Sequence, residues 1–238
     1  MSFGRRLSAR AQRSELGARD RRIIDDIIRH RVLTNDAVHC LHMAASMPNA
    51  TVKVTSRLVN QGWLKAHDFL ARNQYFVLGR KAIRVYGLPA SRTRPLGPQA
   101  LAVQLALLEF IVRTEPRLRL LTTNEVHSLV GDPGAVYSGL PHAVIADGSC
   151  DVIRLIRVDL GGSPAHLVSK LESTVRECVG RSHYASLIAK KRFVLVTLTA
   201  TSDKKLLIET AIRKKPWPVG VRFNVSVTPI LYQLIGRK

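Results

Sequence analysis

Cysteine is scarce in this sequence, and the few cysteines present are poorly placed for joint chemistry. Cys40, Cys150 and Cys178 are odd in number and widely spaced, without the close pairs that zinc modules use. We therefore expect buried or free thiols in a reducing cytoplasm. No apolar run approaches the length of a membrane span, and the basic start of the chain is not followed by an apolar core. These absences argue against a membrane partner and against a signal peptide.

Acidic residues are the other scarcity. Aspartate and glutamate number 17 against 37 lysines and arginines, which leaves a formal net charge of +20. A surplus of this size suits a polyanion, because each phosphate that a cation neutralises releases condensed counterions. Residues 1–95 hold 18 basic and 6 acidic residues, so we expect the nucleic-acid surface in the front of the chain. A basic protein without a nucleic-acid partner is the plainer alternative.

The front of the chain divides into two segments of different composition, residues 1–18 and 19–88. The first is basic and poor in large apolar residues, which predicts a flexible arm that can contact phosphates. The second has isoleucines at helical spacing in ARDRRIIDDIIRHR, a candidate helix cap at Thr34, and a third helical segment that ends at Gly62. Two short alternating strands follow around LARN, and RKAIRVYGL returns to helical spacing. Three helices, a hairpin and a closing helix predict a winged helix-turn-helix.

The third helix of this segment carries the candidate DNA-contacting residues. Val54 and Leu58 lie four residues apart and are expected to point into the core. The side of the helix opposite Val54 and Leu58 has two interpretations, and the first is an ordinary solvated face. The second interpretation is DNA contact, because this side carries amides, a hydroxyl and two cations in one continuous polar stripe that suits a major groove. The residues of the stripe are Asn49, Lys53, Ser56, Arg57 and Asn60.

The hairpin after this helix favours DNA binding. Its tip, Arg72 and Asn73, is placed like a wing that reaches a minor groove or the DNA backbone. Arg80 and Lys81 begin the next helix, where backbone amides favour phosphate.

Residues 89–98 form the expected linker, because LPASRTRPLGP is rich in proline and also holds glycine. Beyond it, QALAVQLALLEFIVRTE predicts an apolar helix, for which we favour core packing over pairing with a second copy. The remaining residues predict a mixed α/β domain, with strands in HAVIAD, DVIRLIRVDL, RFVLVTLTA and VRFNVSVTPIL and helices in SPAHLVSKLESTVRECVG and DKKLLIETAIRKK.

Asp147, Asp151 and Asp159 lie in or beside two of the predicted strands. Acids on adjacent strands can hold Mg²⁺ near a lysine and an attacking water, as phosphodiester cleavage requires. The stretch LPHAVIADG to IRLIRVDLGGSPAHLVSKLEST resembles the central part of the PD-(D/E)XK nuclease-like superfamily. With the winged helix in front, residues 19 to about 200 are similar to the replication-relaxation family of plasmids and other mobile elements. The resemblance implies a restriction-endonuclease-like domain over residues 99–238.

Two departures from the family pattern fall on the acids most directly tied to metal. The pattern is Pro-Asp-Ala on the first strand, then Glu-Val-Asp-x-Gly, then Lys-Leu on a helix. His142 stands at the first aspartate and Arg157 at the glutamate. An arginine there repels Mg²⁺ and attracts phosphate. The resemblance thus implies a nuclease-like domain without cleavage, although these residues match: Pro141, Ala143, Val158, Asp159, Gly161, Lys170 and Leu171.

Residues and resemblance together predict a sequence-directed, double-stranded DNA-binding protein of a plasmid or other mobile element. It would act in replication or transfer control, or in transcriptional regulation. We expect no enzyme activity, no cofactor and no metal, and a bacterial cytoplasmic location with the nucleoid or a plasmid. The expected partners are duplex DNA, a second copy of the chain, and other proteins of a replication, transfer or transcription complex.

Two alternatives remain. A metal-dependent endonuclease would use Asp147, Asp151, Asp159 and Lys170 as a rearranged centre with Mg²⁺. A protein-interaction module would use the winged helix to bind another protein instead of DNA.

Overall fold

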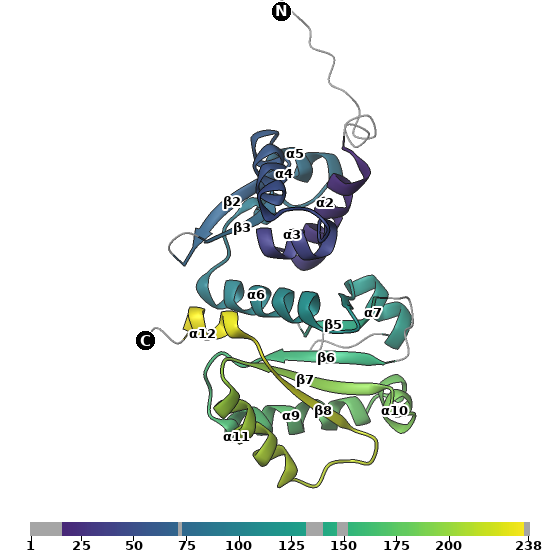
Figure 1. Cartoon of the computed structure of the whole chain (residues 1–238). Helices are drawn as coiled ribbons and strands as arrows, with labels where there is room; N and C mark the ends of the chain where they lie inside the picture. The colour runs from purple at the N-terminus through teal and green to yellow at the C-terminus, as the bar shows by residue number, and fades with distance from the viewer. Residues whose placement is uncertain (1–15, 71–72, 132–139, 147–151, 236–238) are drawn as a thin grey trace, which may run out of the picture. The chain divides into compact units, whose positions relative to one another are not determined.

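The computed structural model describes residues 16–70, 73–131, 140–146 and 152–235 of a mixed α/β chain (Figure 1). The chain divides into a first unit, Met1–Pro98, and a second unit, Gln99–Lys238. The division falls at the end of the predicted linker. No helix within the described ranges is both long enough and apolar enough to cross a bilayer.

The first unit builds its helices around a three-stranded antiparallel sheet with the order β1-β3-β2. β3 is the central strand, so the β2–β3 hairpin is bonded to the chain between the first two helices. In chain order the elements are α2 (Ala18–His30), β1 (Leu33–Thr34), α3 (Asn35–His42), α4 (Pro48–Asn60), β2 (Leu64–Phe69), β3 (Asn73–Leu78), α5 (Arg80–Tyr86) and the short 3-10 helix η1 (Ala90–Thr93).

Local chemistry sets the ends of α3 and α4. The Thr34 hydroxyl caps α3 by accepting the backbone N–H of Ala37 at 3.2 Å. After α4, Gly62 adopts a φ of 74°, which lets the Trp63 N–H reach the Leu58 carbonyl at 3.0 Å. The predicted cap at Thr34 and the predicted stop at Gly62 are both confirmed.

The core of the first unit lies between the helices and the hairpin. Ile23, Ile24 and Ile27 of α2 are at most 1% exposed, as their spacing predicts. Val54 and Leu58 of α4 are also buried, which confirms the inward face expected for that helix.

Both ends of this unit extend further than the sequence predicts. Leu16 lies within the predicted arm, yet it is 3% exposed and its carbonyl accepts a hydrogen bond from Arg21 Nε at 3.0 Å. The predicted linker packs on the same unit, because both terminal nitrogens of Arg92 donate to the Ile28 carbonyl, at 2.9 and 3.0 Å. Residues 1–15 of the predicted arm lie outside the described ranges.

A five-stranded mixed sheet with the order β4-β5-β6-β7-β8 organises the second unit. β4, β5 and β6 pair antiparallel, whereas β6, β7 and β8 pair parallel. In chain order the elements are α6 (Pro98–Arg113), β4 (Leu118–Leu120), α7 (Thr123–Val130), β5 (His142–Ile145), β6 (Ile153–Val158), α9 (Pro164–Val179), α10 (Ser182–Ala189), β7 (Phe193–Thr199), α11 (Ser202–Arg213), β8 (Arg222–Val227) and α12 (Pro229–Ile235).

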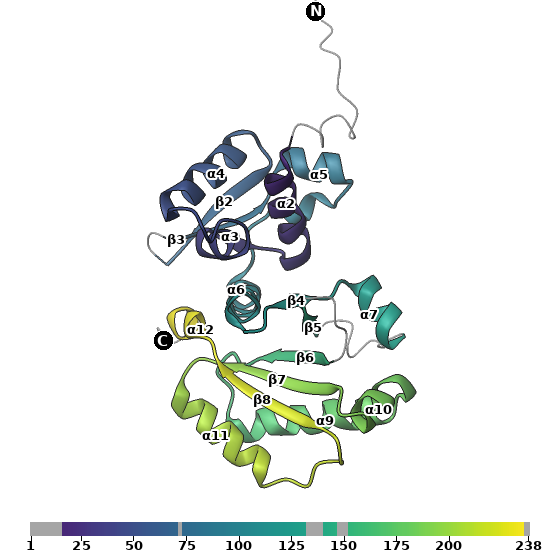
Figure 2. The same cartoon turned by 45° about the vertical axis from the view of Figure 1, so that its right-hand side comes forward.

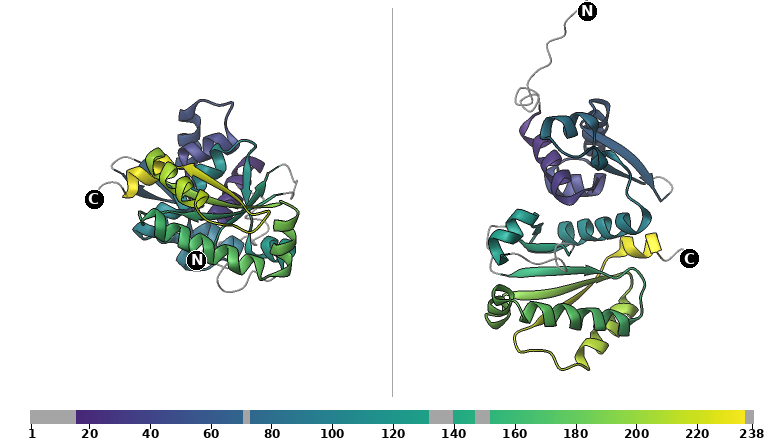
Figure 3. Two further views of the ribbon diagram at one scale, coloured as in Figure 1. Left: turned by 90° about the horizontal axis from the view of Figure 1, so that it is seen from below. Right: turned by 180° about the vertical axis from the view of Figure 1, so that it is seen from behind.

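Helices cover both faces of this sheet (Figures 1 and 2). α6 and α12 pack on one face, against alternate residues such as Val196 and Leu198 of β7. α9, α10 and α11 pack on the other, against Phe193 and Leu195 and against Val225 of β8. α9 and α11 lie side by side along that face, as the rear view in Figure 3 also shows. Burial on both faces explains why β7 is a nearly continuous β-branched and apolar run.

The second unit contains elements that the sequence did not predict: β4, α7, α10 and α12. The predicted last strand, VRFNVSVTPIL, is also too long, since β8 ends at Val227 and its final residues belong to α12. Proline explains the change, because Pro229 has no N–H to continue the sheet and suits the first turn of a helix.

A buried polar pair joins β5 to α10 in this core. His142 Nε2 lies 2.7 Å from Tyr184 Oη, and the Tyr184 ring packs edge-on against Phe193. His142 is 3% exposed, and this burial lowers its pKa to about 4. His142 therefore belongs to the packed interior.

The buried His142 predicts a loss of stability on mild acidification. In the unfolded chain the imidazole takes up a proton near its ordinary pKa, while the folded protein resists protonation until the pH approaches 4. Stability should be complete above about pH 6.5 and fall towards pH 4, by up to about 3 kcal/mol. His142→Gln, which keeps a polar partner for Tyr184 without titrating there, should flatten this slope.

Urea unfolding followed through Trp217, in a Trp63→Phe background that removes the other tryptophan, measures the effect in the second unit alone. If the wild-type protein and the His142→Gln variant lost equal stability over that pH range, the loss could not be assigned to His142.

Candidate functional site

The polar side of α4 is the first candidate surface. Asn49, Lys53, Ser56, Arg57 and Asn60 are all exposed, while the opposite side of the helix is buried, so the structure brings the five residues onto one accessible face, the α4 stripe. The sequence spacing predicts this arrangement.

Polar contacts with α3 fix the orientation of α4. Thr55 Oγ1 donates to Asn35 Oδ1 at 2.8 Å, and Thr51 Oγ1 lies 3.3 Å from His39 Nδ1. Both threonines are 1% exposed, so these are interior bonds on the side of α4 that faces α3. Together with the buried Val54 and Leu58, they hold the α4 stripe outward on a packed support.

Arg57 differs from the other residues of the stripe. Its Nη2 donates to Asp20 Oδ2 at 2.6 Å, and Asp20, on α2, is only 6% exposed. Asp20 also accepts a hydrogen bond from Arg19 at 3.1 Å. The Arg57 guanidinium is thus anchored within the protein, with 47% of its side chain exposed.

Two exposed apolar side chains lie on α4 or directly before it, and the sequence pattern did not single them out. Met47, which precedes α4, is 78% exposed, and Val52 is 46% exposed. Val52 lies three residues after Asn49 and four before Ser56, on the same side of the helix. The same helical spacing that identified the α4 stripe could therefore have identified Val52 as part of this side of the helix.

The hairpin and α5 place the remaining predicted DNA-contacting residues. Asn73 is exposed and opens β3, paired with Phe69 across the hairpin. Arg80 is exposed at the start of α5. Lys81 is half-buried, with Nζ 4.8 Å from the centre of the Trp63 ring, a cation–π contact. Arg72 lies outside the described residues.

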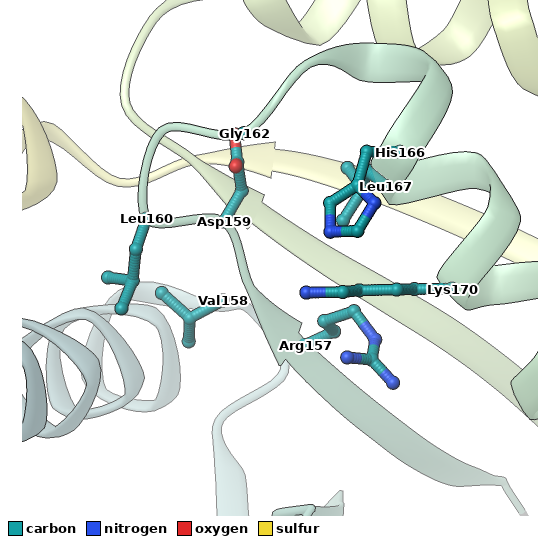
Figure 4. Close-up of a pocket in the computed structure, with 8 residues that line it drawn as sticks. All are labelled: Arg157, Val158, Asp159, Leu160, Gly162, His166, Leu167 and Lys170. Atoms are coloured by element: carbon teal, nitrogen blue, oxygen red, sulfur yellow. The ribbon is translucent and has the colours of Figure 1, made fainter.

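A pocket in the second unit is the other candidate site. It lies at the carboxyl end of β6, beside the first turns of α9, and has a volume of about 280 Å³ (Figure 4). We call it the α9 pocket. Its lining combines basic and apolar side chains with one carboxylate: Arg157, Val158, Asp159, Leu160, Gly162, His166, Leu167 and Lys170.

Three basic side chains, Arg157, His166 and Lys170, line the α9 pocket. In Figure 4 the Lys170 side chain extends between His166 above and Arg157 below. Arg157 comes from β6, and its Nη2 donates to the buried Thr174 of α9 at 3.1 Å. Thr174 in turn donates to the Lys170 carbonyl at 2.9 Å. These bonds tie the arginine to the helix that carries the lysine.

Asp159, the carboxylate of the pocket lining, is committed to bonds within the protein. Its Oδ2 lies 2.6 Å from Lys204 Nζ and accepts a hydrogen bond from Thr199 Oγ1 at 3.2 Å. Its Oδ1 accepts the Gly161 N–H at 3.1 Å, and the residue is 5% exposed. Both carboxylate oxygens therefore have partners, on β7, on α11 and in the loop after β6.

The described residues of this region do not fit a Mg²⁺ site. Asp159 is already neutralised by Lys204, while Arg157 and Lys170 add positive charge that repels a divalent cation. Within the described ranges no group of three histidine, cysteine or acidic residues could hold a metal ion. Asp147 and Asp151, the other acids of the endonuclease alternative, lie outside those ranges.

Comparisons with known proteins found no match for this chain among protein-family models, curated proteins or solved structures.

The Asp159–Lys204 pair predicts a marked difference between single and double substitution. Asp159→Asn leaves the Lys204 ammonium without its counter-charge and should destabilise the second unit by about 3 kcal/mol. Lys204→Met in addition removes the uncompensated charge, so the double variant should recover much of this loss. A double-mutant cycle measured by urea unfolding tests the coupling. Strictly additive effects would show that the two side chains do not stabilise each other.

Proposed function

We propose that this chain is a sequence-directed duplex DNA-binding protein, with a winged helix-turn-helix in its first unit and α4 as the recognition helix. The order helix, short strand, two helices, then a hairpin bonded to that strand is the arrangement of this class of domain. The observation that carries the proposal is the α4 stripe, an exposed polar face held on a packed support.

The chemistry of the stripe suits a major groove. Asn49 and Asn60 offer amides, which can pair with the edge of adenine, and Lys53 offers a cation for guanine or phosphate. Val52 adds an exposed apolar surface of the kind that contacts the thymine methyl group. Arg57, anchored by Asp20, is better placed to fix the helix against the backbone than to select bases.

For the second unit we propose a nuclease-like fold that does not cleave DNA. The ion pair of Asp159 with Lys204 and the basic lining of the α9 pocket support this view, because both oppose metal-assisted hydrolysis. The resemblance of the sequence to the replication-relaxation family extends the proposal to the control of replication, transfer or transcription on a mobile element.

DNA recognition by α4 predicts that a defined sequence can be selected from random duplex DNA. The full chain should enrich one motif, and a palindromic motif would indicate binding by a two-fold dimer. The Lys53→Ala, Asn60→Ala double variant should lose the motif and bind about tenfold or more weakly, with a salt dependence reduced by about one phosphate contact. Arg57 is left unchanged because its removal would also break the ion pair with the buried Asp20.

Lys214→Ala, which removes an exposed cation of the second unit, is the charge-matched control and should leave the motif unchanged. The proposal fails if the wild-type chain enriches no sequence, or if the α4 double variant enriches the same motif with unchanged affinity. Binding to a protein instead of duplex DNA would then favour the interaction-module alternative.

The absence of cleavage is tested on supercoiled plasmid DNA. Incubation with Mg²⁺ or Mn²⁺ should leave the plasmid supercoiled, even at protein concentrations that saturate it. Nicking or linearisation that disappears in Lys170→Ala, a change that leaves the Asp159 ion pair intact, would instead establish the endonuclease alternative.

A further inference from the structure

We propose that the α9 pocket is a binding site for a phosphate group, separate from the α4 stripe. The proposal goes beyond DNA recognition by the first unit and depends on none of its residues. It concerns the phosphate of a small ester or of a nucleic-acid backbone, since both present the same anionic oxygens.

The charge of the pocket points to an anion. Arg157, His166 and Lys170 supply its polar donors, and Figure 4 shows all three side chains along one side of the same space. The carboxylate in the lining does not offset them, because Asp159 is bound to Lys204 at 2.6 Å. An anion entering the pocket would meet cationic donors and no unpaired carboxylate among the lining residues.

The kinds of donor point to phosphate in particular. A guanidinium offers a rigid fork of N–H groups that matches two oxygens of a phosphate, while an ammonium acts as a compact charge that adapts to the remaining ones. Here the guanidinium comes from β6, where its Nη2 also donates to Thr174, and the ammonium comes from α9, so the two cations belong to different elements.

The rest of the pocket indicates the size of the ligand. Val158, Leu160 and Leu167 add apolar surface beside the basic groups. A volume of about 280 Å³ lies at the small end of the range for ligand pockets. This combination suits a phosphate joined to a small organic group, such as a single nucleotide unit, better than a large cofactor.

Calorimetric titration of the intact chain, in a phosphate-free buffer at constant ionic strength, tests the site with three probes. Inorganic phosphate tests binding of the bare anion, and thymidine monophosphate tests binding of a terminal phosphate ester. The dinucleoside monophosphate of thymidine tests binding of an internal phosphodiester. Saturable binding of inorganic phosphate or of either ester is expected. Preference for the terminal ester would identify a small phosphate ester as the ligand, and equal binding of the diester would identify a nucleic-acid backbone.

Substitutions locate the binding. Lys170→Gln and His166→Gln change exposed side chains, so both variants should fold, and each should weaken phosphate binding, Lys170→Gln by about tenfold. Lys190→Gln removes an exposed lysine outside the pocket and should bind as the wild type does. The proposal is overturned if the wild-type chain binds none of the three probes, or if all three variants bind them equally well.

The two proposals fail separately. The Lys53→Ala, Asn60→Ala variant should keep its phosphate site while losing its DNA motif. Lys170→Gln should select the wild-type motif while losing phosphate affinity. Loss of phosphate binding in the α4 variant would show that the anion binds to the first unit and would overturn the assignment to the α9 pocket.

Discussion

The ion pair between Asp159 and Lys204 decides the character of the second unit. It joins the end of β6 to the start of α11, and the Thr199 hydroxyl adds a bond from the end of β7. Removing either charge would leave the other poorly solvated, so the pair is kept even though forming it costs desolvation. The ion pair also affects the α9 pocket, because Asp159 is part of its lining. Because the carboxylate is bound to Lys204, the remaining charged or titratable side chains of the lining are basic, namely Arg157, His166 and Lys170. This is the basis of the proposed anion site.

The first unit uses a similar bond for a different purpose. Asp20 on α2 holds the Arg57 guanidinium on α4, while Thr55 and Asn35 join α4 to α3. Such interior bonds fix the helix in one orientation. The proposed recognition of bases would need this, because it requires side chains placed to within a fraction of a hydrogen-bond length. Basic side chains thus occur in both candidate sites: on the exposed α4 stripe and in the lining of the α9 pocket.

Much of the fold could be predicted from local pattern. Isoleucines at helical spacing, the Thr34 cap, Gly62, and the Ser163 cap followed by Pro164 all identify helix ends or faces that the structure contains. The failures have local causes as well. The helix α7 was not predicted, although it opens with a capping box of Thr122 and Glu125 that the sequence contains. β4 is three residues long, too short for alternation to show.

The sequence by itself determined the charge surplus, the two-part organisation, the main helices and strands, and the residues of the α4 stripe, because composition and periodicity are properties of neighbouring residues. Only the tertiary structure decided which charges meet. Two helices and a strand, α9, α10 and β7, separate Asp159 from Lys204 along the chain. A strand and a helix, β1 and α3, separate the helices that carry Asp20 and Arg57. The burial of His142 against Tyr184 likewise depends on how α10 packs on the sheet. Contacts between residues far apart in the chain leave no periodic signal, so they follow from packing alone.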